Sequence, residues 1–186
     1  MRIGIFGTGA MADALGTHWA RAGHELRVAG RRTGTWTEVA AFADVVLLAI
    51  PADAVFEVLP EAGPLRGKVL VDCTNQPGPT GTEPPPGTPV ATRIAAAAPG
   101  AHVVKAFNLA PADVWRKPPA TLAVPLCGDD PAALDAVRTL VRDVGCRPVS
   151  GGGLDRAHLL EATAAFAIGL WFAGEDAQAI LVSAHS

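Results

Sequence analysis

The sequence predicts an α/β fold with a doubly wound, mostly parallel sheet and a helix at its C-terminal end. A short apolar strand, residues 2–6, runs directly into a glycine-rich turn. Later segments alternate between strand-like apolar runs and helical spacing, and the run A-D-V-V-L-L-A-I at 43–50 is typical of a parallel strand covered on both faces. Strands that alternate with helices favour such a sheet, known as the Rossmann fold, with ligands expected beyond the carboxyl ends of the strands.

The order of the elements favours a single domain over residues 1–186. We expect strands over residues 2–6, 25–29, 43–50, 68–73, 102–107, 122–126 and 146–149. We expect helices over residues 10–22, 52–59, 90–98 and 131–144 and from residue 154 onward. Gly23 and Gly145 are placed to end two of these helices, and Pro125 favours an edge position for its strand. Residues 77–89 hold six prolines and three glycines and are interpreted as a loop within the domain.

Composition excludes several classes of function. A formal net charge of −3, with acidic and basic residues interspersed, gives no nucleic-acid footprint. The three cysteines, Cys73, Cys127 and Cys146, are dispersed, which favours reduced thiols in a cytoplasmic protein over a disulfide framework or a metal site. The first residues are not typical of a signal peptide, and the uncharged stretch 162–173 is shorter than the roughly 20 residues of a membrane span.

The glycine-rich turn has the context of a dinucleotide site, because a strand precedes it and a helix follows. Gly7 permits the tight bend, Gly9 lets a pyrophosphate approach the backbone, and Ala12 takes the third glycine's packing position. Free N–H groups at the helix start favour phosphate anions. The alternative is a tight strand-to-helix connection without a ligand.

The end of the second strand carries Arg31 and Arg32 where an acidic residue would hold the ribose of NAD. Two guanidinium groups offer positive charge and fork-shaped donors to a 2′-phosphate. The sequence therefore predicts NADP rather than NAD, although a solvated basic turn is the alternative interpretation.

Several segments together resemble the family of F420-dependent NADP oxidoreductases. The matching stretches are M-R-I-G-I-F-G-T-G, G-H-E-L-R-V-A-G-R-R, D-V-V-L-L-A-I-P, V-V-K-A-F-N, V-P-L-C-G-D-D and R-P-V-S-G-G-G-L-D-R-A-H-L-L-E. They are spread over almost the whole chain. One departure is Gly30, because family members often carry serine before the paired arginines.

The resemblance implies an NADP(H) site. In it the pyrophosphate is held by Gly7, Thr8, Gly9, Ala10 and Met11, and the 2′-phosphate lies at Gly30, Arg31 and Arg32. The ribose and adenine side is lined by Ile50, Pro51 and Ala52. Thr74 and Asn75 lie nearer the nicotinamide, and the floor on which it meets the second substrate is formed by Ala106, Phe107 and Asn108.

Few side chains are candidates for proton transfer, and the resemblance implies no fixed catalytic side chain. The chain has no tyrosine, which excludes the Tyr–Lys relay of short-chain dehydrogenases. Lys105 is one candidate, although its side chain is also expected to leave the sheet at an edge. His158 and Glu161, three apart on the last helix, are compatible with a cleft or with a solvated face. Asn108 is the best polar candidate for orienting a ligand.

Three functions are compatible with these residues. The first is hydride transfer between NADPH and coenzyme F420, or a similar acceptor, which requires mainly proximity of two bound heterocycles. The second is NADPH-dependent reduction of a small imine or ketone, for which a proton donor is expected. The third is a non-catalytic NADP-binding sensor or partner subunit. The largely apolar segment 154–186, which includes Trp171 and Phe172, predicts a homodimer contact, although core packing is the default for both aromatic residues.

Overall fold

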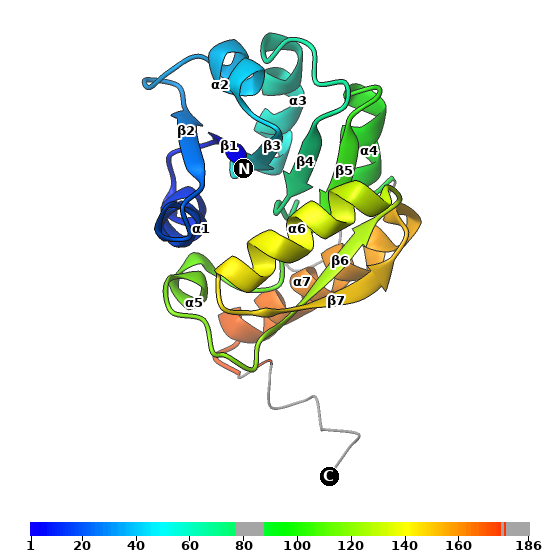
Figure 1. Cartoon of the computed structure of the whole chain (residues 1–186). Helices are drawn as coiled ribbons and strands as arrows, with labels where there is room; N and C mark the ends of the chain where they lie inside the picture. The colour runs from blue at the N-terminus through cyan, green and yellow to red at the C-terminus, as the bar shows by residue number, and fades with distance from the viewer. Residues whose placement is uncertain (77–87, 176, 178–186) are drawn as a thin grey trace.

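Seven strands form one sheet in the computed structural model of the chain, which describes residues 1–76, 88–175 and 177 (Figure 1). The sheet order is β2-β1-β3-β4-β5-β6-β7; the first five strands are parallel, β6 is antiparallel to β5, and β7 is parallel to β6. The bounds of the strands are β1 (Arg2–Phe6), β2 (Glu25–Ala29), β3 (Val45–Leu48), β4 (Val69–Asp72), β5 (His102–Lys105), β6 (Ala123–Gly128) and β7 (Arg147–Gly152). The predicted mostly parallel α/β fold is confirmed.

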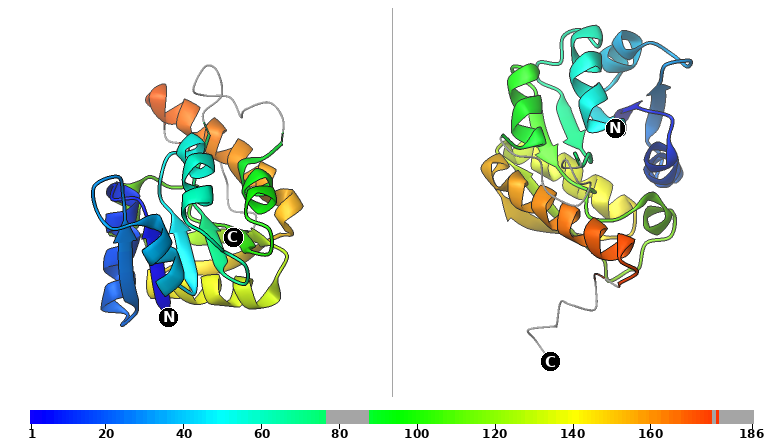
Figure 2. Two further views of the ribbon diagram at one scale, coloured as in Figure 1. Left: turned by 90° about the horizontal axis from the view of Figure 1, so that it is seen from above. Right: turned by 180° about the vertical axis from the view of Figure 1, so that it is seen from behind.

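Helices cover both faces of the sheet (Figures 1 and 2). One face packs against α1 (Ala10–Arg21), α5 (Ala112–Arg116) and α6 (Pro131–Asp143). The opposite face packs against α2 (Trp36–Phe42), α3 (Ala52–Glu61), α4 (Val90–Ala97) and α7 (Ala157–Phe172), which follows a short 3₁₀ turn at Leu154–Arg156. Two apolar cores result, one on each side of a sheet whose central strands are buried, as the continuous apolar runs predict. None of the described helices combines the length and apolarity that a bilayer crossing requires.

The register of the parallel strands brings their carboxyl ends to one edge of the sheet. Phe6 pairs with Ala29 and with Leu48, and Leu48 pairs with Asp72. Asp72 in turn pairs with Lys105. Strand β1 has β2 on one side and β3 on the other, so the order in which strands are added to the sheet reverses at β1. Sheets of this kind bind ligands at such a switch point, beyond the carboxyl ends of the strands.

Local signals account for several boundaries. Gly23 and Gly145 adopt positive φ angles of 87° after α1 and α6, as expected of residues that end helices. Asp130 caps α6 by accepting a hydrogen bond from the N–H of Ala133 at 2.8 Å. The Thr35 hydroxyl likewise accepts from the N–H of Glu38 and starts α2.

The structure corrects three expectations. The edge position expected for the strand with Pro125 is wrong, because β6 lies between β5 and β7; its register with β5, however, covers only Cys127 and Gly128, so the proline lies beside β7 alone. Helices α2 and α5 were not expected from the sequence. In the single chain Trp171 and Phe172 are exposed rather than packed in the core. Most of the predicted loop, 77–87, and residues 176 and 178–186 of the C-terminal segment lie outside the described residues.

Candidate functional site

The glycine turn lies between the end of β1 and the start of α1. Gly7 has a φ of 124°, and a Cβ atom there would overlap the carbonyl oxygen of Ala49, so only glycine fits. Gly9 is the N-cap of α1 and brings no side chain to the first N–H groups of the helix. A Cβ built on Gly9 would meet nothing within 4 Å. The turn therefore forms an open cradle in front of a helix N-terminus, which fits a pyrophosphate.

A cavity of about 510 Å³ opens beside this cradle. Its wall includes Gly7, Thr8 and Gly9 from the turn, Gly30 and Arg31 from the end of β2, and Ile50 and Pro51 from the end of β3. Of the other predicted residues on this side, Ala10 and Met11 form the first turn of α1, and Ala52 is buried at the start of α3. The structure thus brings most of the residues predicted for the pyrophosphate, ribose and adenine to one hollow.

A second cavity, of about 470 Å³, is lined by Thr8, Arg31, Arg32 and Thr33. Thr8 and Arg31 line both cavities, so the paired arginines lie next to the phosphate turn. Gly30 forms a bridge with Thr33, through N–H···O distances of 2.7 and 3.1 Å, and this bridge holds the arginines in a tight turn. Guanidinium groups in such a place provide both charge and donors for a 2′-phosphate.

Thr8 explains why position 30 carries glycine. A Cβ atom on Gly30 would lie 2.8 Å from Cγ2 of Thr8 and 3.4 Å from its hydroxyl oxygen. The threonine side chain therefore fills the space beside position 30, and its hydroxyl lies close to where a residue-30 side chain would begin.

Replacing Gly30 with serine is expected to lower the free energy of unfolding by about 1–3 kcal/mol, because the new Cβ overlaps the Thr8 methyl group. Replacing Thr8 with serine removes that methyl group and keeps the hydroxyl. Chemical denaturation of both single variants and the double variant checks this. The double variant should recover most of the loss, and strictly additive effects would contradict the steric explanation.

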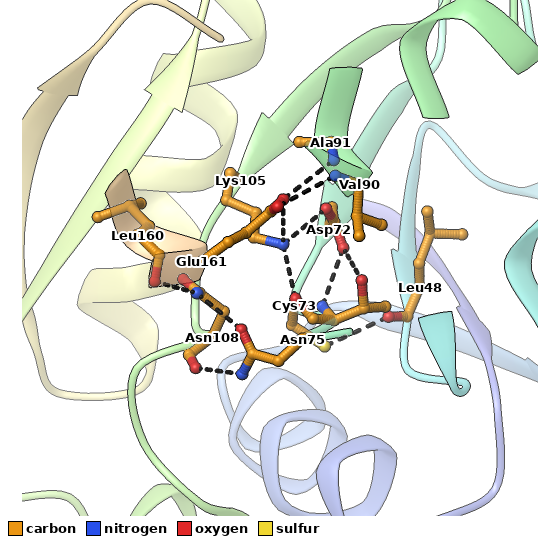
Figure 3. A network of polar contacts seen from close by, with 11 residues as sticks. Leu48, Asp72, Cys73, Asn75, Val90, Ala91, Lys105, Asn108, Leu160 and Glu161 are labelled. Carbon is orange, nitrogen blue, oxygen red and sulfur yellow. Dashed lines mark hydrogen bonds and ion pairs between the residues drawn. The ribbon is translucent and has the colours of Figure 1, made fainter. Parts of the chain in front are cut away.

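On the other side of the switch point, Asn75 and Asn108 form a hydrogen-bonded pair after β4 and β5 (Figure 3). Asn75 Nδ2 donates to the backbone oxygen of Asn108 at 2.7 Å, and Asn108 Nδ2 donates to Asn75 Oδ1 at 3.0 Å and to the Leu160 oxygen at 3.1 Å. Because both acceptors of the Asn108 Nδ2 group are oxygens, the orientation of the Asn108 amide is fixed. Its Oδ1 atom is left, among the described residues, as a buried acceptor without a partner. Such an atom needs a donor.

Phe107 contributes to this site through its backbone. It is a non-glycine residue with a positive φ, 62°, which is rare and strained. Its ring is buried edge-to-face against Trp19 and Trp115, with centroids 6.0 and 5.4 Å away. Ala106 is also fully buried. Of the predicted floor residues, therefore, only Asn108 directs a polar side chain toward Asn75.

A buried ion cluster lies next to these asparagines and is drawn above them in Figure 3. Lys105 Nζ is 2.9 Å from Asp72 Oδ2, 3.1 Å from Glu161 Oε1 and 2.6 Å from the backbone oxygen of Thr74. Thr74 donates to Asp72 Oδ1 through both its N–H and its hydroxyl, at 2.9 and 2.7 Å. Burial by itself lowers the pKa of Lys105, but the carboxylates of Asp72 and Glu161 raise it above its ordinary value. Lys105 is therefore charged at neutral pH.

Glu161 also caps a helix from a distance. Its Oε2 accepts from the N–H of Val90 at 3.0 Å, and its Oε1 accepts from the N–H of Ala91 at 3.1 Å. The N-cap of α4, Pro89, supplies no side-chain hydrogen bond of its own. Glu161 thus joins α7 to α4 and, through Lys105, to the sheet.

Of the three residues predicted as proton donors, Glu161 is buried in this cluster, so the alternative of a solvated helix face is wrong for it. The expectation that Lys105 leaves the sheet at an edge is wrong, because its side chain is fully buried. Its three donor hydrogens point to three acceptors and leave none for a substrate. His158 lies on the surface, where its ring contacts the backbone oxygen of Asp155. Thr74, predicted near the nicotinamide, is buried against Asp72 and presents no free hydroxyl.

The cysteines offer no nucleophile. Burial raises the pKa of all three thiols, that of Cys73 to about 12, so each stays protonated at neutral pH. Within residues 1–76, 88–175 and 177, no group of three or more His, Cys, Asp or Glu side chains is arranged to hold a metal ion.

Sequence reasoning missed the far wall of the larger cavity. This wall is formed by Trp36 at the start of α2 and by Ala54, Glu57, Val58 and Glu61 on α3. The signal that could have located Trp36 is the sequence Thr35-Trp36-Thr37-Glu38, which matches a capping box and indicates a helix start.

Comparison with known proteins agrees with this geometry. Residues 2–37 and 32–76, taken as two matches, fit the family described as "NADP oxidoreductase coenzyme F420-dependent". A candidate F420-dependent NADP reductase from Arthrobacter sp. FB24 superposes with a TM-score of 0.84 and 26% identity, over 95% of this chain and 96% of that one. A hypothetical protein from Sinorhizobium meliloti gives a TM-score of 0.71 and 24% identity, over 85% and 88%.

A reductive aminase from Aspergillus terreus, solved with NADPH and ethyl levulinate, superposes with a TM-score of 0.69 and 22% identity. The match covers 93% of this chain but only 62% of the aminase, so that likeness concerns the fold. The family match over residues 2–76 and the Arthrobacter neighbour indicate an NADP-dependent oxidoreductase. The resemblance predicted from the sequence is confirmed: residues 2–76 match the family model of the F420-dependent NADP oxidoreductases, and the Rossmann-like fold is similar to that of the Arthrobacter protein.

Proposed function

We propose that this protein transfers a hydride between NADPH and coenzyme F420 or a similar flat acceptor. The observation that carries the proposal is the pair of adjoining cavities that share Thr8 and Arg31, one at the glycine cradle and one at Arg31 and Arg32. A diphosphate fits the first and a 2′-phosphate the second. The residues proposed to hold NADP(H) are Gly7, Thr8, Gly9, Ala10, Met11, Gly30, Arg31, Arg32, Ile50, Pro51, Ala52, Thr74, Asn75, Ala106, Phe107 and Asn108.

Bound NADPH supplies the hydride, and the chain's own residues hold and orient the reacting ends. The orphaned Oδ1 of Asn108 is a buried acceptor beside the carboxyl ends of β4 and β5. A carboxamide N–H group would satisfy it, which supports a role for Asn108 in orienting the nicotinamide.

Among the residues that the structure describes, no free acid lies near Asn108, which favours an acceptor that needs none. Lys105 and Glu161 are occupied with each other and with backbone groups. A deazaflavin takes the hydride at C5 and a proton at N1, and solvent can supply that proton without a side-chain acid, whereas reduction of an imine or ketone is expected to need a positioned proton donor. This supports the deazaflavin over a small imine or ketone as the substrate.

The test is the absorbance of NADPH mixed with oxidised F420 and the purified full chain. We expect loss of NADPH absorbance together with loss of the F420 band, and an inactive Arg31→Ala/Arg32→Ala variant at the same NADPH concentration. Oxidation of NADPH only by a panel of imines and ketones would overturn the F420 proposal in favour of the second function. Binding of NADPH without turnover on either set would favour a sensor.

We further propose a cytoplasmic homodimer in which residues 154–186 form the contact. In the described part of that segment, α7 exposes Leu159, Phe166, Trp171 and Phe172, and the exposed fraction reaches 59% for Phe166 and 81% for Phe172. A helix that is apolar on all sides is normally covered.

Replacing both Phe166 and Phe172 with glutamate is expected to convert the dimer to a monomer, because buried charges would oppose the contact. Size-exclusion chromatography with light scattering measures the mass directly. Val28→Glu, at an exposed apolar position on the edge strand β2, is the matched control and should stay dimeric. A wild-type chain of monomeric mass would refute the proposal.

A further inference from the structure

We propose that Glu57 and Glu61 recognise the exocyclic amino group of the adenine of NADP(H), and that Trp36 is the aromatic wall beside the base. The inference rests on the proposed binding of NADP(H) and adds the residues that select the base. The phosphate turn and the arginines give no function to the wall of the larger cavity formed by Trp36 and α3, and this inference assigns one.

The larger cavity has two chemically different ends. At one end Thr8 and Arg31 continue into the second cavity, where Arg32 adds a further cation. At the other end the lining carries the carboxylates of Glu57 and Glu61. A ligand that spans this hollow therefore needs an anionic group at the arginines and hydrogen-bond donors at α3. Adenosine 2′-phosphate meets both requirements with one molecule, since its phosphate is anionic and its base carries an amino group.

The spacing of residues on α3 places the carboxylates on the cavity. Ala54 and Val58 are four apart, as are Glu57 and Glu61, so the four residues share one helix face. The two apolar side chains give a surface for a flat ring, and the carboxylates border it. Among the described residues neither carboxylate has a hydrogen-bond or ion-pair partner, whereas Asp53 on the same helix accepts from Gln76 at 2.9 Å. Both glutamates are thus available to a ligand.

Trp36 is held in place from the opposite side. Its ring packs edge-to-face on the buried Phe6, with centroids 5.2 Å apart, and it lines the cavity from the first turn of α2. The neighbouring Thr37 hydroxyl donates to the Glu61 backbone oxygen at 2.7 Å, which ties α2 to the end of α3. The helices that carry the aromatic wall and the two glutamates are therefore tied to each other. A large, rigid aromatic surface beside apolar α3 residues fits a purine.

An ionised carboxylate accepts hydrogen bonds and donates none. The amino group at C6 of adenine donates to it, whereas hypoxanthine and guanine place a carbonyl oxygen at C6, which is repelled, and offer a donor only at the neighbouring N1. A glutamine at the same position can donate to that carbonyl. For a carboxylate that faces the C6 substituent, the chemistry therefore predicts a preference for adenine over a 6-oxopurine, and glutamine in place of glutamate should weaken that preference.

The experiment uses isothermal titration calorimetry of the full chain to compare the dissociation constants of NADPH and of reduced nicotinamide hypoxanthine dinucleotide phosphate. We expect the wild-type protein to bind NADPH roughly tenfold or more tightly than the hypoxanthine analogue, which is the effect of one charge-assisted hydrogen bond. In Glu57→Gln/Glu61→Gln the preference should shrink to about twofold or less. Glu38→Gln on α2, which removes one carboxylate charge outside the cavity lining, should keep the wild-type ratio.

Trp36→Leu tests the aromatic wall separately. The substitution should weaken the binding of both dinucleotides by a similar factor, roughly tenfold, because stacking on the aromatic ring does not depend on the group at C6 of the base. Trp36→Phe should recover most of that loss. Circular dichroism confirms that each variant is folded.

Equal affinity of the wild-type chain for the two dinucleotides, or a preference unchanged in the double glutamine variant, would overturn the inference. If in that case NADPH binding still depends on Arg31 and Arg32, the proposed NADP site stands and only base recognition fails. Absence of NADPH binding by the wild-type chain would overturn both.

Discussion

Replacement of Lys105 with methionine is expected to lower the free energy of unfolding by about 3–5 kcal/mol. The side chain of Lys105 is fully buried between Asp72 and Glu161. Methionine matches the length of the lysine stem but removes the charge, so two carboxylates are left buried without a cation. Urea denaturation followed by circular dichroism measures the loss. Since this is a large share of the stability of a typical domain, we expect the variant to be largely unfolded at 37 °C.

Two controls separate this effect from a general loss of lysine. Lys117→Met, at an exposed position, should change the free energy of unfolding by no more than about 0.5 kcal/mol. Asp72→Asn/Lys105→Met/Glu161→Gln, which removes all three charges, should be more stable than Lys105→Met alone. If the triple variant is less stable than Lys105→Met, the hydrogen bonds of the two carboxylates contribute more to the free energy of unfolding than their unpaired charges cost.

The same cluster predicts a dependence on alkaline pH. The pKa of Lys105 is raised in the folded chain by Asp72 and Glu161. The stabilising contribution of Lys105 to the free energy of unfolding is therefore complete below the pKa of a lysine in the unfolded chain, about 10.4. It is lost as the pH rises through the higher pKa of the folded chain. Denaturation midpoints measured from pH 8 to 11 should fall in the wild-type chain above about pH 10. The fall should be smaller in Lys105→Met, and parallel curves would contradict the assignment.

Replacement of both Arg31 and Arg32 with alanine is expected to weaken NADPH binding by about 10²–10⁴-fold. The two guanidinium groups line the cavity beside Thr8, and each charge-assisted contact to a 2′-phosphate contributes about 1.5–3 kcal/mol. NADH lacks that phosphate, so its affinity should change by less than about threefold. Isothermal titration with both dinucleotides measures the change in preference.

Arg27→Ala is the matched control for this prediction. Arg27 lies on β2, with its guanidinium over the ring of Phe42 at 4.3 Å, and it does not line either cavity. It should leave the ratio of NADPH to NADH affinity unchanged. Equal loss of NADH and NADPH binding in the double alanine variant would mean that the arginines serve the pyrophosphate instead.

Strands β1, β3, β4, β5 and β6 were predictable because each is a short, mainly apolar run bounded by glycine, proline or polar residues. Residues 43–50 show this most clearly, since a parallel strand buried on both faces needs no alternation. The five-residue helix α5 could not be predicted by periodicity, because one turn and a half carries no helical repeat. The position of β6 also escaped prediction. Pro125 normally marks an edge, but here the pairing with β5 ends before the proline is reached.

The candidate site was predictable where it depends on neighbouring residues and not where it depends on distant ones. The glycine turn is one continuous stretch of sequence and Arg31–Arg32 is another, so each has a local pattern. The structure brings the two stretches to adjoining cavities. Lys105, by contrast, meets Asp72 and Glu161 from elements far apart in the chain, so no local pattern indicates its burial. The backbone conformation of Phe107 could not be predicted for another reason. A positive φ at a non-glycine residue has no sequence signature.

The cap that Glu161 places on α4 also has a consequence for the order in which the chain becomes stable during synthesis. Glu161 is translated 71 residues after Val90, whose N–H it accepts. Strands β1 to β4 pair entirely within residues 2–72 and can assemble as soon as that segment has emerged from the ribosome. The first turn of α4 and the ammonium group of Lys105 must wait for α7. A nascent chain stalled before residue 161 should therefore hold a protease-resistant first half and a second half that is still open to cleavage.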